Sequence, residues 1–325
     1  MTVHRTAPGG VVFRPITGPA EIDLFNRLPY TINDELADDL AAGRRRPEWM
    51  WVALRGDHLL ARVAWWGRPG DSSPLLFDIL DLDDELDDGL DDEVGDLTSV
   101  ARELYGTAVA RVVPVGTAAP EYGRFVPANW REEPGARQAV ESRMAIVEST
   151  GGRLLVERLR LEWRSGNGVP AVDRRLAFRP VSGPGELIGL MIRVLDGTLD
   201  AHSRADLAEM SARDTAVRHY EEEFANYSSP RQWWRVATLG EGGEPVGFII
   251  PARNSYHPII AYLGVLPEHR GRGYVHGILA EGTRVLAAEG VTHIRAATEL
   301  GNAPMADAFA RAGYVNFERA INMAF

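Results

Sequence analysis

Residues 258–280 of the chain read PIIAYLGVLPEHRGRGYVHGILA. An apolar run that ends at Val265 is followed by a turn with two glycines and then by apolar residues at helical spacing. Gly271 and Gly273 let the turn adopt left-handed backbone conformations and approach a ligand closely. Successive N–H groups ahead of a helix attract anions, and two arginines in the turn add positive charge. The stretch therefore predicts a phosphate-binding loop between a strand and a helix.

Composition narrows the class of protein. A length of 325 residues exceeds the roughly 100–200 residues of one domain, so two domains are expected. No apolar run approaches the roughly 20 residues of a membrane span, and no signal peptide is apparent, so we expect a cytoplasmic protein that binds no membrane. The absence of cysteine excludes disulfides and an acyl-cysteine intermediate. The net charge of -11 argues against nucleic-acid binding, and the eight histidines lack metal-ligand spacing, so no metal is expected.

The sequence contains an internal repeat. Residues 13–22 read FRPITGPAEI and residues 178–187 read FRPVSGPGEL, with six of ten positions identical at an offset of 165. Farther on the offset becomes 184, and residues 74–82 (PLLFDILDL) align with residues 258–266 (PIIAYLGVL). The second copy thus carries about 19 additional residues after its first helix. The chain is therefore expected to contain two copies of one fold.

Each copy alternates strands and helices, which predicts a mixed α/β (α+β) fold with a central mixed sheet flanked by helices. Residues 164–174 read RSGNGVPAVDR, and their glycines and proline are typical of a surface connection. We therefore predict tandem domains at residues 1–165 and 175–325.

Only the second copy carries the predicted loop. At the offset of 184, Arg270 to Gly273 align with Leu86, Asp87, Asp88 and Gly89. The segment 78–96 of the first copy contains eleven acidic residues, which repel a phosphate and cannot donate to it. Two interpretations of this acidic segment stay open, a solvated surface and a site that attracts a cationic partner. The first copy is expected to support the second and to bind no phosphate in this way.

Two motifs of the second copy carry a resemblance to a known family. RGRGYV, residues 270–275, resembles the motif of the GNAT superfamily of N-acetyltransferases, in which Arg or Gln, two residues, Gly, one residue, and Gly or Ala precede a helix. Val275 departs from the last position of that motif. NAPMADAFARAGY, residues 302–314, resembles the following motif of the superfamily. The resemblance covers residues 176–325, and it reaches the first copy only through the repeat.

The resemblance implies acetyl-CoA as a co-substrate. It further implies that the fourth and fifth strands of the domain separate, so that the backbone of the fourth strand binds the pantetheine arm and the thioester carbonyl. Asn302 is expected to cap the next helix while its amide faces this arm. The residues expected to bind the co-substrate are Leu263, Gly264, Val265, Arg270, Gly271, Arg272, Gly273, Tyr274, Val275, Asn302 and Phe309.

Direct attack of an amine on a thioester needs an acceptor for the amine proton and stabilisation of the leaving group. Glu299, at the end of the predicted fifth strand, and Tyr262, in the fourth, are candidates, and each can equally be an ordinary strand residue. The family position that often holds a tyrosine acid is Phe309 here, which cannot donate a proton. CoA then leaves as the thiolate, or takes a proton from water or from Tyr314, a position that the family more often uses for packing.

Two functions follow from these observations. The first is an N-acetyltransferase, an acyltransferase that moves a group other than an aminoacyl group, acting on an amine of a small molecule or peptide. The second is a catalytically weak CoA-binding sensor or scaffold, favoured by Val275 and Phe309. The sequence leaves open the amine acceptor, the preferred acyl chain, the general base and acid, the role of the first copy, and whether the protein is a monomer or a homodimer.

Overall fold

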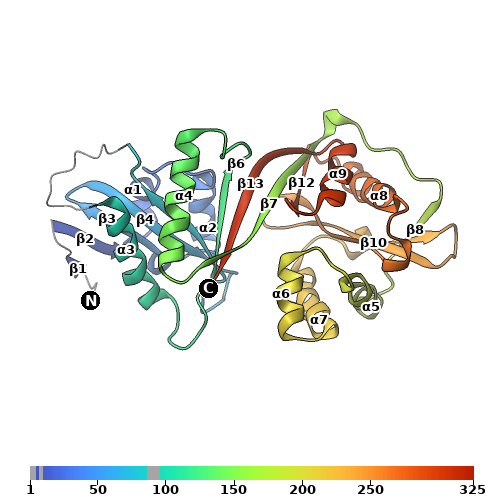
Figure 1. Cartoon of the computed structure of the whole chain (residues 1–325), viewed down its shortest axis with the longest axis horizontal. Coiled ribbons are helices and arrows are strands. Elements are labelled where there is room, and N and C mark those ends of the chain that lie inside the picture. Colours follow the sequence, from blue (N-terminus) through green and yellow to red (C-terminus); the bar gives the residue numbers. More distant parts are fainter. Residues whose placement is uncertain (1–4, 7–9, 86–95) are drawn as a thin grey trace. The chain divides into compact units, whose positions relative to one another are not determined.

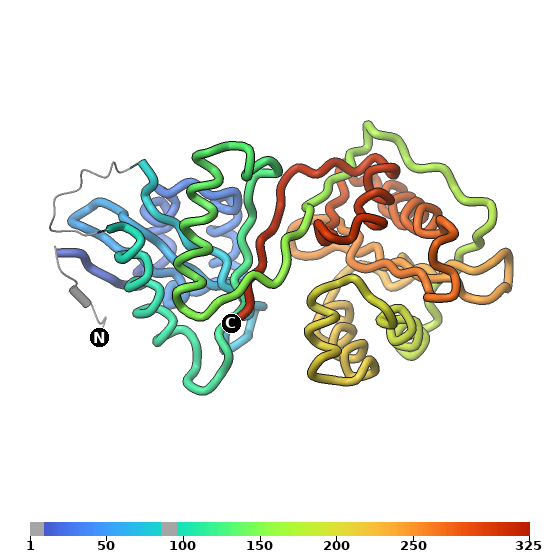
Figure 2. Tube along the Cα trace, in the orientation of Figure 1, coloured from blue at the N-terminus to red at the C-terminus, as the bar shows by residue number. Residues whose placement is uncertain are grey.

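The computed structural model describes residues 5–6, 10–85 and 96–325. The chain divides into two compact units, which can be followed along the trace in Figure 2. Unit 1 comprises Met1–Leu155 together with Ala320–Phe325, and unit 2 comprises Val156–Arg319. Each unit is built on a mixed sheet with helices on both faces, as the repeat predicts (Figure 1). No helix in the described ranges is long and apolar enough to cross a membrane.

The sheet of unit 1 is antiparallel except for the pairing of β5 with β6, which is parallel. Its strands, in spatial order, are β1 (Arg5–Thr6), β2 (Val11–Pro15), β3 (Met50–Arg55), β4 (His58–Trp66), β5 (Leu76–Leu82) and β6 (Glu121–Pro127). Its helices are α1 (Ile22–Phe25), α2 (Leu36–Ala41), α3 (Leu97–Val112) and α4 (Pro134–Ser149). Side chains alternate across a strand, so Trp51 packs in the core under α3 and α4, whereas Val52 packs in the core with α1 and α2.

Unit 2 repeats this plan with one further helix. Its strands, in spatial order, are the first part of β13 (Val315–Ala324), then β7 (Arg153–Arg164), β12 (His293–Glu299), β11 (Pro258–Val265), β10 (Pro245–Arg253), β9 (Arg235–Leu239) and β8 (Leu176–Pro180). Its helices are α5 (Pro184–Leu195), α6 (Ala201–Glu209), α7 (Ala212–Glu222), α8 (Tyr274–Ala288) and α9 (Ala303–Arg311). Helices α8 and α9 lie on one face of the sheet and α5 on the other (Figure 1).

The repeated segments at the start of each copy form the same hydrogen-bond pattern. Arg14 of β2 makes a bidentate pair with Glu21, whose carboxylate also accepts from the backbone N–H of Thr17 at 2.7 Å. Arg179 of β8 pairs with Glu186 in the same way, and Ser182 donates its N–H to that carboxylate at 2.7 Å. The hydrogen bond from Arg179 lowers the pKa of Glu186 to about 2. The repeat is therefore structural as well as sequential.

The boundary between the units differs from the one predicted at residues 165–175. Most of β7 belongs to unit 2, where it pairs with β12 from Arg164↔His293 to Arg158↔Glu299. The end of β13 belongs to unit 1, where Ile321 and Met323 are buried in the core. The last strand of the first repeat thus completes the sheet of the second, and the chain end returns to the first. The glycine-rich segment 164–174 connects β7 to β8 and does not separate the units.

Candidate active site

The predicted phosphate-binding loop lies at the N-terminus of α8. Gly271 and Gly273 have φ angles of 73° and 76°, in the left-handed region that favours glycine, and Gly273 is the N-cap residue of the helix. Within the described residues, none of the five backbone N–H groups from Gly271 to Val275 donates to a protein acceptor. Free donors and the positive end of a 15-residue helix together form a site for an anion.

The two arginines of the loop have different environments. Arg270 donates from all three guanidinium nitrogens, to the carbonyls of Val265 at 3.1 Å, Asp196 at 2.7 Å and Val194 at 2.8 Å. The side chain of Arg272 is exposed, and its guanidinium has no hydrogen-bond or ion-pair partner in the part of the chain that the structure describes. The sequence assigned both arginines to the phosphates, but the guanidinium of Arg270 is held by three carbonyls, whereas that of Arg272 has no protein partner among the described residues.

A further arginine beside the loop was not predicted. The guanidinium of Arg175 lies 4.6 Å from the ring centre of Tyr274, the first residue of α8, and donates to the carbonyl of Arg272 at 3.1 Å. Its other hydrogen bonds go to Asp173. Arg175 precedes β8, far from the loop in sequence, so no local pattern indicates its position. This pair buttresses the loop and adds a second exposed cation beside it.

Strands β11 and β12 separate close to their starting residues. Their parallel pairing is limited to Ile259↔Arg295, whereas β11 continues to pair with β10 as far as Gly247↔Val265. The register with β10 shifts at Ala261, which has no partner and forms a bulge that increases the local twist. One edge of Leu263–Val265 therefore has no strand partner among the described residues, which is the separation that the family resemblance implied. These backbone groups are available to an extended ligand.

Helix α5 packs unusually close to this part of β11. A Cβ atom on Gly264 would lie 2.6 Å from Cγ1 of Val194, which is closer than real Cβ atoms approach. Gly264 is therefore required by the packing of α5 on the strand, whatever ligand its backbone contacts.

The carboxylate of Glu299 lies at the end of β12 and is 6% exposed. One of its oxygens accepts a hydrogen bond from the backbone N–H of Ala201, the first residue of α6. The other oxygen lies 3.9 Å from the guanidinium of Arg204. Glu299 thus caps a helix with one oxygen, and its second oxygen forms a long ion pair with Arg204.

Tyr262 of β11 is surrounded by aromatic rings. Its ring centre lies 5.8 Å from that of Phe224 and 5.5 Å from that of Phe248. Burial raises the pKa of Tyr262, the carboxylate of Asp200 raises it further, and Arg270 opposes this shift. The phenol is therefore neutral at neutral pH, so it can donate a hydrogen bond but cannot serve as a base.

Comparison with known proteins identifies this arrangement. Residues 202–314 match the model of the Acetyltransferase (GNAT) family. The chain therefore carries a GNAT-family domain. That match spans the splayed strands, the phosphate-binding loop, Glu299 and α9, and no curated protein matches the chain.

Solved structures show that the whole chain has a tandem GNAT-like fold. A GCN5-related N-acetyltransferase from Sphaerobacter thermophilus is 15% identical, covering 96% of this chain and 94% of its own, with a TM-score of 0.58. A tandem GNAT protein from the clavulanic acid biosynthesis pathway is also 15% identical and covers 97% and 98%, with a TM-score of 0.53. A glucosamine N-acetyltransferase region of a fungal multi-domain β-N-acetylglucosaminidase is 16% identical and covers 98% and 38%, with a TM-score of 0.56.

The second motif of the GNAT domain contributes mainly to packing. Asn302 caps α9, its side chain accepting from the N–H of Met305 at 3.4 Å, as predicted for the cap. Phe309 is 1% exposed and packs edge-to-face on Tyr314, with 5.0 Å between ring centres. Val275 also packs against this core. Phe309 is thus enclosed by protein, and its predicted contact with the co-substrate stays untested.

The hydroxyl proton of Tyr314 is already used in a hydrogen bond to Thr283. The Thr283 hydroxyl donates to the carbonyl of Leu279 at 3.0 Å and lies 2.9 Å from the Tyr314 hydroxyl. Because a threonine hydroxyl has one proton, Tyr314 must be the donor in the second bond. Burial also raises the pKa of Tyr314, which makes it a weaker acid. These contacts favour packing over proton donation to a leaving group.

Replacing Tyr314 with Phe should therefore cost stability and leave turnover unchanged. The variant loses one hydrogen bond, so the free energy of unfolding should fall by about 1 kcal/mol, as chemical denaturation would measure. The ring contact with Phe309 is retained. A tenfold fall in turnover with unchanged affinity for acetyl-CoA would instead identify Tyr314 as the proton donor.

In unit 1 the corresponding strand edge is filled by protein. Strands β5 and β6 pair only at Leu76↔Glu121 and Phe77↔Tyr122 and then separate. Arg124 of β6 donates to the carbonyl of Leu80 at 3.0 Å, and Leu80 aligns with Gly264 in the repeat.

Arg124 is held in this position by charge. Its guanidinium lies 2.9 Å from the carboxylate of Asp81, which also pairs with Arg62. Burial opposes the ionisation of Asp81, yet Arg124 and Arg62 lower its pKa below the usual value. The predicted counterpart of the phosphate-binding loop, Leu86 to Gly89, lies outside the described residues.

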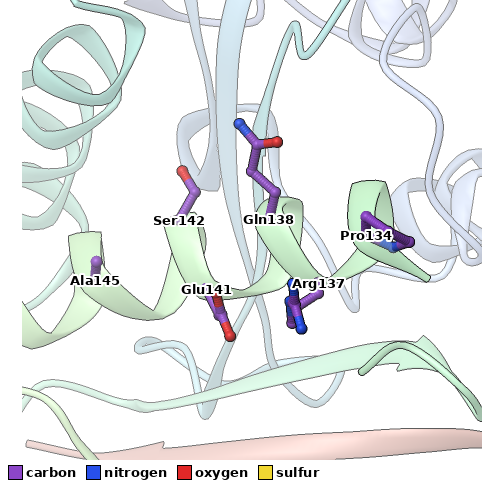
Figure 3. Close-up of a pocket in the computed structure, with 6 residues that line it drawn as sticks. All are labelled: Pro134, Arg137, Gln138, Glu141, Ser142 and Ala145. Atoms are coloured by element: carbon purple, nitrogen blue, oxygen red, sulfur yellow. The ribbon is translucent and has the colours of Figure 1, made fainter. Parts of the chain in front are cut away.

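A shallow hollow lies along α4 in unit 1, not in the GNAT domain. Figure 3 shows its six lining side chains, which all project from this one helix. They are Pro134, Arg137, Gln138, Glu141, Ser142 and Ala145. One helix cannot surround a ligand, so this hollow does not resemble an active site. In the described ranges, no group of three or more His, Asp or Glu side chains is placed to hold a metal ion.

Proposed function

We propose that unit 2 catalyses direct transfer of an acetyl group from acetyl-CoA to an amine of a small molecule or peptide. The observation that carries this proposal is the row of N–H groups from Gly271 to Val275 without protein acceptors among the described residues, which is separated by residues 266–270 from the unpaired strand edge Leu263–Val265. A pyrophosphate at the loop would continue into an extended pantetheine arm along that edge. Arg272 would add charge at the phosphates.

The reaction forms a C–N bond and breaks the C–S bond of the thioester. The amine nitrogen attacks the carbonyl carbon, and the sulfur leaves with its electron pair as the thiolate of CoA. A backbone N–H of the β11 edge would stabilise the negative charge that develops on the carbonyl oxygen. A thiol has a pKa of about 8.5, so the thiolate can leave without a protein acid.

The amine must lose one proton during this reaction. We assign its uptake to the Glu299 carboxylate oxygen that lies 3.9 Å from Arg204, directly or through a water, because the other oxygen accepts a hydrogen bond from the N–H of Ala201. Tyr262 is assigned to hydrogen-bond donation within the same site, since its phenol stays protonated. Unit 1 would support unit 2 without binding acetyl-CoA, because Arg124 occupies the equivalent strand edge.

Replacing Glu299 with Gln tests the assignment of the base. The amide oxygen can still accept from Ala201, so α6 should keep its position, but the side chain no longer takes up a proton at neutral pH. Turnover should fall on the order of 10²-fold, with acetyl-CoA affinity within about twofold of wild type. Unchanged turnover would exclude Glu299 as the base.

A panel of amine acceptors, each supplied with acetyl-CoA and monitored by thiol release, tests the proposed reaction. At least one amine should release thiol faster than the water background. Val275 and the buried Phe309 motivate the alternative of a CoA-binding sensor or scaffold. Stoichiometric acetyl-CoA binding with no thiol release from any amine would favour that alternative.

A further inference from the structure

The side chain of Arg270 connects three segments of unit 2. Its three donors reach the last residue of β11, Val265, and two carbonyls at the end of α5, those of Val194 and Asp196. Helix ends leave carbonyl groups without intrahelical partners, and a guanidinium suits them in both charge and geometry. A few residues away, Arg193 of α5 also pairs with Glu268. The end of α5 is thus fastened to the phosphate-binding loop.

The turn between α5 and α6, residues 195–200, fits closely around this guanidinium. Gly197 has a φ angle of 63°, and a Cβ atom there would lie 3.2 Å from Nη1 of Arg270. Thr198 donates its N–H to the carbonyl of Leu195 at 3.2 Å, which closes the turn. The turn is therefore packed closely against the guanidinium of Arg270.

The C-terminal end of the same turn contacts the acceptor side of the site, meaning the side that contains Glu299, the residue assigned as the base. Asp200 pairs with Arg158 of β7 at 2.9 Å, and the N–H of Ala201 is held by Glu299. Residues 196–201 thus link the phosphate-binding loop to the carboxylate assigned as the base.

We propose that Arg270 is a positioning residue and not a phosphate ligand: it holds the turn 195–200 in place and so couples the acyl-CoA loop to the acceptor side. This inference rests on the proposed function. Three carbonyls fix the position of the Arg270 guanidinium and use three of its five N–H donors, so turning it toward a phosphate would break these bonds, whereas the Arg272 guanidinium has no bond to break among the described residues. Loss of Arg270 should then disturb amine binding more than acetyl-CoA binding.

Three variants separate the two roles, with Arg272→Gln as the matched control. Arg270→Gln removes the charge and the guanidinium, and Arg270→Lys keeps the charge but lacks the planar guanidinium geometry that reaches the three carbonyls. Both Arg270 variants should accelerate hydrogen exchange in residues 195–203 about tenfold and raise the KM of the amine more than that of acetyl-CoA. Arg272→Gln should leave this exchange unchanged, weaken acetyl-CoA binding and reduce its salt dependence.

A phosphate-ligand role would give the opposite pattern. Full rescue of acetyl-CoA affinity by Arg270→Lys, with unchanged exchange in residues 195–203 of both Arg270 variants, would overturn the proposal. The exchange of α8 and α3 serves as the control for overall folding. Hydrogen exchange and calorimetric binding can be measured without turnover. An inactive wild-type protein would refute the proposed reaction, but these two measurements would still decide the role of Arg270.

Discussion

Replacing Gly273 with Asp should lower the affinity for acetyl-CoA by about 10³-fold. The substitution places a carboxylate at the N-cap of α8, beside the proposed position of two phosphates. Charges about 4 Å apart at an effective dielectric constant of about 40 repel by roughly 2 kcal/mol each, or about 4 kcal/mol for two. The protein should still fold, because Asp tolerates the left-handed backbone and the nearest heavy atom to a Cβ there is 3.7 Å away. Isothermal titration calorimetry would measure the affinity.

The matched control is Gly273→Asn, which has nearly the same shape and backbone tolerance but no charge. It should lose at most about tenfold in affinity, so most of the effect of Asp must come from repulsion of the phosphates. Equal losses in both variants would show that steric crowding, and not charge, determines binding at this loop. Unchanged affinity in both would move the phosphates elsewhere.

Replacing Met323 with Ala should destabilise unit 1, although only two residues follow it in the sequence. Met323 is fully buried in the core of unit 1 beside Ile321. Removing such a side chain costs about 2–5 kcal/mol. Hydrogen exchange in α3, which packs in the same core, should therefore accelerate by more than about tenfold, while exchange in α8 changes much less.

The control for Met323 is Val315→Ala at the other end of the same strand. Val315 is 62% exposed, so its truncation should change the free energy of unfolding by no more than about 0.5 kcal/mol. If exchange in α8 became faster in the Met323 variant while exchange in α3 stayed unchanged, the assignment of the end of β13 to unit 1 would be wrong. Such a result would also remove the explanation for the displaced boundary.

The features that could be predicted from the sequence are those that depend on residues close together in the chain. Gly271 and Gly273 lie between an apolar strand and an amphipathic helix, and their conformations depend on neighbours in the chain. The cap formed by Asn302 is equally local. The repeat added the two-domain plan, because similarity at a fixed offset is independent of contacts in space.

What escaped prediction depends on residues far apart in the chain. Two of the three carbonyls that hold Arg270 belong to residues more than 70 positions earlier, and no pattern near the loop indicates them. Arg175 contacts the loop from nearly 100 positions away. The boundary was misplaced for a related reason, since residues 164–174 have the composition of a domain linker, whereas strand pairing assigns β7 to unit 2.

The central claim is that acetyl-CoA binds at residues 270–275 of unit 2 and nowhere else in the chain. Calorimetric titration of the full-length protein with acetyl-CoA tests it most directly. The account predicts one site per chain, competed by CoA and lost in the Gly273→Asp variant. Two equivalent sites per chain, or one site that persists in that variant, would contradict it.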